Sequence, residues 1–425
     1  MKPNQKRRFR PRKSDVKRSD LYEGRKIRRV HIQIDGIEPQ SKKMPAAVRV
    51  DFQRQVREGL RDLNRNTFKS RMALDLQLAT TKHDAPQAHT IAKNLLDLMS
   101  QPEAALGTPS PELLYDDDSQ IHALAVSCVH GEEHPNITIG ARSMDSFLSD
   151  LALAAEAFRN LDMDDLAHEY ERERDREWID QLRDLIRNEA SHRRRLGNSL
   201  YDAFLKMTRW YGQRALLARA TVTTADLALL FNVPKTGIAT PFPAMWDQMF
   251  RTNGLRMHVG ELPTQAGGSV LFKQQIEASI TEFKETWDWL ISPLVVPVAL
   301  QAVVRPSASM PKGTLHDLDN VVRDYLLPKI VPTFGTVTDH RWTIDFDELR
   351  RTDPKLADRW GDNPTPPKGT RSGVTRYEAF RLPAAKKGEK GFVSVAIVLD
   401  DQLSGDVFRQ MDEQIEKWAA KLNQD

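Results

Sequence analysis

This sequence of 425 residues has only one cysteine and no long apolar run. Its single cysteine, Cys128, excludes an internal disulfide framework and a zinc site built from clustered cysteines. No apolar run approaches the roughly 18 residues of a membrane-spanning helix, and the basic N-terminal segment has no apolar core like that of a signal peptide. We therefore expect a soluble, cytoplasmic protein without a membrane partner, and a core position for Cys128.

Basic charge is concentrated at the N-terminus. Residues 1–30 contain 13 Lys and Arg and three Asp and Glu, a net charge of +10, whereas the whole chain carries +3, so the remainder carries −7. With prolines interspersed, residues 1–29 are expected to be a disordered tail that neutralises DNA phosphates without reading sequence. A tail for solubility or localisation is the alternative. The residues expected to contact DNA here are Arg7, Arg8, Arg10, Arg12 and Lys13.

The length suits two or three domains, and the apolar pattern predicts a first unit over residues 30–142. Alternating apolar residues predict strands at residues 30–35, 72–79 and 121–129. Helical spacing predicts helices at about 46–64 and 90–99. The order strand, helix, strand, helix, strand indicates a small α/β or α+β fold.

The next segment, residues 143–235, has long helical patterns and a densely charged stretch. Two or three helices packed antiparallel would explain it as a spacer between flanking units. We therefore predict a long helical linker.

A second unit is predicted over residues 236–400. Its expected elements are a helix at 269–290, a strand at 295–304, a helix at 321–330 and paired strands at 374–381 and 391–399. Pro297 suggests that the first strand lies at an edge or bulge. The turn between the paired strands carries Lys386 and Lys387, which could contact DNA. Residues 401–425 would form a C-terminal helix, and the overall fold class is α+β, α/β-like.

The sharpest motif is Asp317-Leu318-Asp319-Asn320, directly before the predicted helix at 321–330. In extended backbone, residues two apart point to the same side, so both carboxylates can face one cation. Hard oxygen ligands suit Mg²⁺, which could activate water and offset charge on a phosphodiester. A third acid is needed, and Asp339 follows that helix. The alternative is that Asp319 or Asn320 merely caps the helix.

An eroded copy of this layout lies in the first unit. Gln87-Ala88-His89 stands where the second unit has its two aspartates, and Lys93 follows one helical turn later. An acidic run that includes Asp117 and Asp118 comes before the last strand of that unit. One sharp motif and one eroded copy suggest a duplicated domain.

Taken together, these motifs resemble the RusA-like Holliday junction resolvases, Mg²⁺-dependent endonucleases that act as homodimers on branched DNA. The family's pattern has Asp-x-Asp-Asn opening a helix, a lysine one turn in, and a later acidic segment. The second unit matches the first motif but has Arg323 in place of the lysine. The first unit keeps Lys93 and the acidic segment. The resemblance implies two RusA-like units in one chain, an internal pseudo-dimer that could also form a homodimer.

The resemblance further implies a Mg²⁺- or Mn²⁺-dependent endodeoxyribonuclease that cuts branched DNA such as Holliday junctions, in DNA recombination or repair. Asp317, Asp319 and Asp339 would bind the metal, and Arg323 would stabilise the scissile phosphate. A remnant site in the first unit would comprise Asp117, Asp118, Lys93 and His89. One alternative is a catalytically decayed DNA-binding or scaffold protein with the same fold. A metal-dependent glycosyltransferase also uses Asp-x-Asp, but no nucleotide-binding unit precedes the motif.

Overall fold

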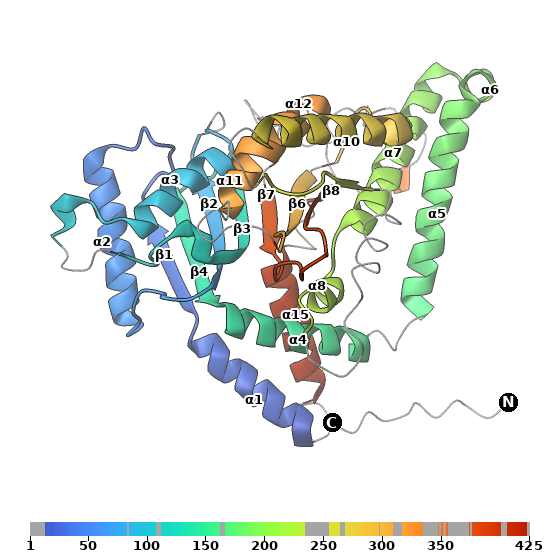
Figure 1. Cartoon of the computed structure of the whole chain (residues 1–425). Coiled ribbons are helices and arrows are strands. Elements are labelled where there is room, and N and C mark those ends of the chain that lie inside the picture. The colour runs from blue at the N-terminus through green and yellow to red at the C-terminus, as the bar shows by residue number, and fades with distance from the viewer. Residues whose placement is uncertain are drawn as a thin grey trace.

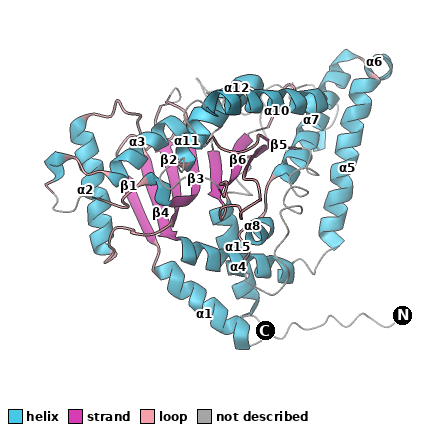
Figure 2. Cartoon of the chain, viewed as in Figure 1, coloured by secondary structure: helices cyan, strands magenta, loops and turns pink. Residues whose placement is uncertain are grey.

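A single mixed sheet of eight strands, flanked by helices on both faces, organises the chain in a computed structural model (Figures 1 and 2). The strand order is β1-β4-β2-β3-β7-β6-β8-β5. No helix among the described residues is long and apolar enough to cross a membrane. The described residues are 13–82, 85–107, 112–161, 166–233, 255–263, 268–296, 298–308, 317–334, 376–400 and 406–422, with isolated positions between 347 and 374.

The first half of the sheet contains four strands in the order β1-β4-β2-β3. They are β1 (Val30–Asp35), β2 (Met72–Thr80), β3 (Ile121–His130) and β4 (Asn136–Ser143). β4 pairs antiparallel with β1 and β2, and β2 pairs parallel with β3. The first three strands are as predicted, and Cys128 of β3 is buried. β4 was not predicted, because Gly140 suggests the end of the unit, whereas it lies inside the strand opposite Asp75.

The second half repeats this order and these pairing directions as β5-β8-β6-β7. Its strands are β5 (Arg256–His258), β6 (Val298–Arg305), β7 (Arg376–Arg381) and β8 (Phe392–Leu399). β3 and β7 pair antiparallel and join the two halves. Each inner strand of one half therefore has a counterpart at the same place in the other half.

Two predictions about the second half are wrong. β7 and β8 do not pair with each other, because β6 lies between them. β6 is therefore a central strand rather than an edge strand, and all eight of its residues are buried. The strand begins at Val298 and pairs without a register shift with β7 over Ala299–Val304 and with β8 over Val298–Arg305. Pro297, where a bulge was the other expectation, lies outside the described residues.

Helices on one sheet face enclose the larger apolar core, which the Leu, Val and Ile side chains of β2, β3 and β6 enter. These helices are α2 (Ala46–Asp62), α3 (Ala88–Ser100), α5 (Leu166–Arg187), α7 (Asn198–Ala220), α10 (Gly268–Ile291) and α12 (Leu327–Phe334). α11 (Leu318–Asn320) and a π-helical turn η4 (Val321–Leu326) lead into α12. The opposite face is covered by α4 (Met144–Leu161), α8 (Thr224–Leu230) and α15 (Val407–Leu422).

The central helices pack onto the second half of the sheet. α6 (Glu189–Leu196) connects α5 and α7, and α7 contacts β8. The buried Gln213 of α7 donates hydrogen bonds to the carbonyl oxygens of Leu290 and Pro293. The helices were expected to link two separate units, but the sheet is continuous across both halves and α7 is part of the fold around it.

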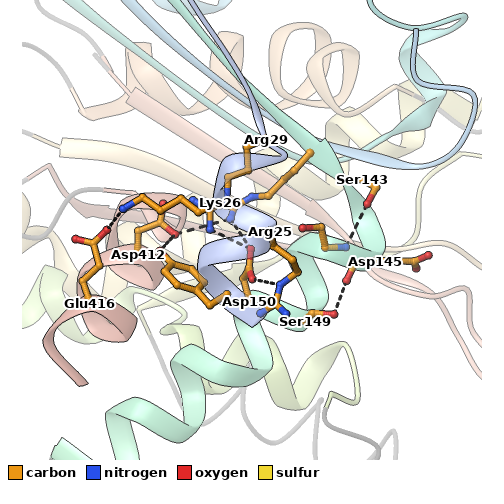
Figure 3. A network of polar contacts seen from close by, with 12 residues as sticks. Arg25, Lys26, Arg29, Ser143, Asp145, Ser149, Asp150, Asp412 and Glu416 are labelled. Carbon is orange, nitrogen blue, oxygen red and sulfur yellow. Dashed lines mark hydrogen bonds and ion pairs between the residues drawn. The ribbon is translucent and has the colours of Figure 1, made fainter. Parts of the chain in front are cut away.

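The N-terminal helix α1 (Lys13–Ile27) corrects the prediction of a tail disordered through residue 29. Its Tyr22 is fully buried and donates a hydrogen bond to Asp412 of α15. Arg25 and Arg29 both bind Asp150 of α4 (Figure 3), whose carboxylate is completely buried. These basic residues therefore serve intramolecular ion pairs. Residues 1–12 lie outside the described part of the chain.

Candidate metal centre

The Asp-x-Asp motif lies where the loop after β6 enters α11. Asp317 occupies the N-cap position with extended backbone (φ −62°, ψ 143°), but its side chain caps no backbone N–H. Instead, Nδ2 of Asn320 donates a 2.9 Å hydrogen bond to Oδ2 of Asp317. Asp319 and Asn320 lie inside the helix, so the alternative that either residue merely caps it is wrong. The Asp317 carboxylate is thus held by a neighbour while capping nothing.

Asp118 belongs to a short turn that precedes β3 in the first half. The turn η2 (Asp118–Gln120) is held by a capping box, in which Asp117 accepts from the Ser119 N–H and Gln120 accepts from the Asp117 N–H. Arg381 of β7 donates a 2.8 Å hydrogen bond to the carbonyl oxygen of Ser119. A strand of the second half therefore helps to fix an acidic turn of the first half.

These two segments bring three carboxylates together. One oxygen from each of Asp118, Asp317 and Asp319 lies within 4.8 Å of the other two. The side chains of Asp118 and Asp319 are 12% and 4% exposed. α11 contacts α3, β3 and β7 (Figure 1), which is why ligands from both halves converge where the halves join.

Lys93 of α3 is the cation that faces this cluster. Its Nζ lies 2.9 Å from Oδ2 of Asp118, 3.2 Å from Oδ2 of Asp319 and 2.9 Å from Oδ1 of Asp97. Although burial opposes its charge, the carboxylates of Asp319 and Asp118 raise the pKa of Lys93, so it stays protonated. One ammonium compensates only part of the charge of three clustered carboxylates.

The pKa values of Asp317 and Asp319 are raised in this cluster. Burial, followed by repulsion from Asp118 and Asp319, raises the pKa of Asp317 to about 6. Burial also raises the pKa of Asp319, against the opposing effect of Lys93. Within the described residues, the buried Oδ1 of Asp118 accepts no hydrogen bond, and the buried Oδ2 of Asp319 has only its 3.2 Å ion pair with Lys93. Such groups are costly without a compensating partner.

A hard divalent cation fits this donor set. Carboxylate oxygens suit Mg²⁺ and Mn²⁺, and a Mg²⁺ site commonly combines a few carboxylates with waters or substrate phosphate. Oxygens at about 2.1 Å from one ion lie at most about 4.2 Å apart, so side-chain movements of under about 1 Å would complete the coordination. Asp118, Asp317 and Asp319 could therefore hold one ion, with open positions for water and a phosphate oxygen.

The structure groups the expected site residues differently from the sequence-based prediction. Asp317 and Asp319 meet Asp118 and Lys93, which the sequence assigned to a separate remnant in the first unit. Asp339, the expected third acid, lies outside the described residues. The sequence did contain a signal for the shared site. The first unit keeps the lysine and the acidic segment of the pattern, and the second unit keeps the Asp-x-Asp motif.

Arg323 and His89 lie close together, and the charge of Arg323 also opposes the rise in the pKa of Asp319. The guanidinium of Arg323 makes a two-pronged ion pair with Asp324, at 2.7 and 2.8 Å. Burial, and then the nearby Arg323, lowers the pKa of His89 to about 4, so its imidazole is neutral at pH 7. The side chain of Asp117 caps the turn η2 and is not one of the three clustered carboxylates, although its charge also raises the pKa of Asp317.

Most of the basic residues expected to contact DNA lie outside the described residues. Arg7, Arg8, Arg10 and Arg12 lie outside the described residues, and Lys13 begins α1. Lys386 and Lys387 are exposed in the turn between β7 and β8. Arg381 is a basic residue near the cluster that was not among the site residues expected from the sequence. Its side chain is buried near Asp317, and burial lowers its pKa to about 10.

Comparisons with protein-family models, with curated proteins and with solved structures give no match to this chain. The geometry of its own residues is therefore the basis for assigning a function.

Proposed function

We propose that this protein is a Mg²⁺- or Mn²⁺-dependent endodeoxyribonuclease that hydrolyses a phosphodiester in branched DNA. The observation that carries the proposal is the meeting of Asp118, Asp317 and Asp319 within 4.8 Å, with Lys93 as the facing cation. Oδ1 of Asp118 is buried without a hydrogen-bond donor among the described residues, and Oδ2 of Asp319 has only its ion pair with Lys93 there, which points to an ion as the missing partner.

The three aspartates would hold the ion, which when bound supplies an activated water and offsets charge on the phosphodiester. Lys93 would keep Asp118 and Asp319 at a fixed separation, because its ammonium contacts both. Arg381 would keep the turn of Asp118 against β7 through its bond to Ser119. These residues would position the metal ligands from the two halves relative to each other.

We further propose that the chain is a duplicated, RusA-like unit, an internal pseudo-dimer. The strand orders β1-β4-β2-β3 and β5-β8-β6-β7 correspond, and their pairing directions agree. The antiparallel β3–β7 contact is the arrangement that a two-fold axis between equivalent strands produces. Branched DNA as substrate, and a role in recombination or repair in the cytoplasm, follow from the resemblance of Asp317-Leu318-Asp319-Asn320 and its surroundings to that family.

The test is cleavage of a labelled four-way junction by the purified chain with Mg²⁺ or Mn²⁺, compared with a linear duplex. Asp319→Asn should lower the cleavage rate at least 100-fold, whereas Asp62→Asn should stay within twofold of wild type. Asp62 is an exposed residue at the end of α2 and is not part of the carboxylate cluster. Cleavage that survives in Asp319→Asn would refute the assignment of the site.

The competing function is a DNA-binding scaffold whose catalytic site has decayed. The observation in its favour is the loss of both aspartates in the first unit, where Gln87 and His89 stand. Calorimetric titration with Mn²⁺ separates the two. A nuclease should bind the ion through Asp319 and cut the junction, whereas a scaffold should bind the junction with neither metal binding nor cleavage.

A further inference from the structure

We propose that the protein cuts one DNA strand in each binding event, because among the described residues a carboxylate cluster forms at only one of its two equivalent positions. This inference rests on the proposed nuclease function and concerns the outcome of its reaction. It depends on comparing the two positions that the repeated strand order relates.

The two positions are equivalent in their surroundings. In the first half, Gln87 and His89 follow β2 and begin α3, with Lys93 one turn later. In the second half, Asp317 and Asp319 follow β6 and begin α11, with Arg323 one turn later. β2 and β6 occupy corresponding places, each between a parallel and an antiparallel neighbour.

The first-half position has different chemistry from the carboxylate cluster. His89 is partly buried and neutral, and Arg323 reduces its affinity for a proton further. Arg323 itself is bound by both nitrogens of its fork to Asp324. The position therefore presents an amide, an imidazole and a guanidinium that is already paired with a carboxylate. Nothing in this set requires a hard cation.

The sequence also offers no carboxylate at the stretch that corresponds to Asp118. Asp118 precedes β3, and the corresponding stretch precedes β7, the strand that β3 meets across the junction of the halves. Residues 363–377 before and at the start of β7 contain no aspartate or glutamate. A site equivalent to the first cannot be built from those residues.

One metal site places one scissile phosphate in reach of activated water. The two backbones of duplex DNA are related by two-fold axes, so an enzyme with two equivalent sites can cut both strands without dissociating. This chain would have to release its nicked product and bind again in another orientation to cut the second strand. Nicked DNA should therefore accumulate ahead of doubly cut DNA.

The experiment uses a supercoiled plasmid with an inverted repeat that extrudes a cruciform. The full-length chain is bound to the plasmid without metal, and Mg²⁺ is added together with an excess of unlabelled four-way junction as a trap. We expect over 90% of the cut plasmid to be nicked circles both with and without the trap, because the first nick relaxes the plasmid and the cruciform is reabsorbed before the chain can bind again. Linear plasmid as the main product in the presence of the trap would overturn the inference.

A matched pair of variants locates the cuts. His89→Gln should change neither the nicking rate nor the nicked-to-linear ratio by more than twofold, with folding verified by thermal unfolding. Asp319→Asn should abolish both products. Selective loss of linear plasmid in His89→Gln would mean that a second site is active and would overturn the inference. Absence of any cut by the wild-type chain would overturn the proposed function itself, an outcome distinct from cutting of both strands.

Discussion

Replacing Asp317 with Asn should make the metal-free protein more stable while abolishing its response to metal. The carboxylate of Asp317 has a pKa of about 6 in the folded chain, against 3.8 for an ordinary aspartate. The folded state therefore keeps a proton that the unfolded state has lost between these two values. Ionisation lowers stability as the pH rises through this window, and the full penalty applies above pH 6.

The magnitude follows from the size of the pKa shift. A shift of about two units corresponds to about 3 kcal/mol, and the partial exposure of Asp317 reduces this by solvent screening to about 1–2 kcal/mol. Asparagine is neutral and nearly the same size, so it removes the repulsion from Asp118 and Asp319 without creating a cavity. The gain should be full at pH 7.5 and should vanish only below about pH 3, where aspartate is protonated in both states.

Urea denaturation measures this gain. At pH 7.5 in EDTA, Asp317→Asn should raise the free energy of unfolding by about 1–2 kcal/mol. With Mn²⁺ at 100 times the dissociation constant, the wild-type chain should gain about 2.7 kcal/mol, and the variant should gain little. Asp62→Asn, at an exposed position, serves as the control. A variant less stable than wild type in EDTA, or one stabilised equally by Mn²⁺, would refute the electrostatic reasoning.

Three further results are expected. Lys93→Gln should lower the free energy of unfolding in EDTA by about 1–3 kcal/mol, because Asp118 and Asp319 lose their facing cation; Mn²⁺ should recover the loss, and the exposed Lys42→Gln should have little effect in the same denaturation series. Mn²⁺ affinity measured by calorimetry should rise with pH through about 6, where Asp317 is half deprotonated, and level off above about 7; a constant affinity between about pH 5 and 7 would contradict the role of Asp317. Arg29→Met should cost about 2–4 kcal/mol of stability by leaving buried Asp150 less compensated, whereas the exposed Arg28→Met should cost under about 0.5 kcal/mol; equal urea midpoints for the two variants would show that the α1 ion pairs contribute nothing.

Local pattern was enough to predict most elements of the fold. The alternation of Val30, Ile32 and Ile34 predicted β1, and the spacing of Phe52, Val56 and Leu60 predicted the buried face of α2. These predictions succeed because one face of each element is buried, and burial imposes the period of a strand or helix. The helix start after Asp317 was predicted for the same local reason.

Strand neighbours could not be predicted in this way. β7 and β8 follow one another along the described chain and were expected to pair, yet β6 separates them. Pairing depends on which distant strands share a core, and residue periodicity carries no information about that choice. The basic pattern of α1 failed similarly, since the acids that neutralise it, Asp150 and Asp412, come from α4 and α15.

By itself, the sequence determined that Asp317 and Asp319 stand together where a helix begins, because their spacing and the following apolar pattern are local properties. Only the tertiary structure decided that Asp118 and Lys93 complete the same cluster. The physical reason is the antiparallel contact between β3 and β7, which brings the turn before β3 against the helix that follows β6. Two incomplete motifs, far apart in the chain, become one acidic site across that contact.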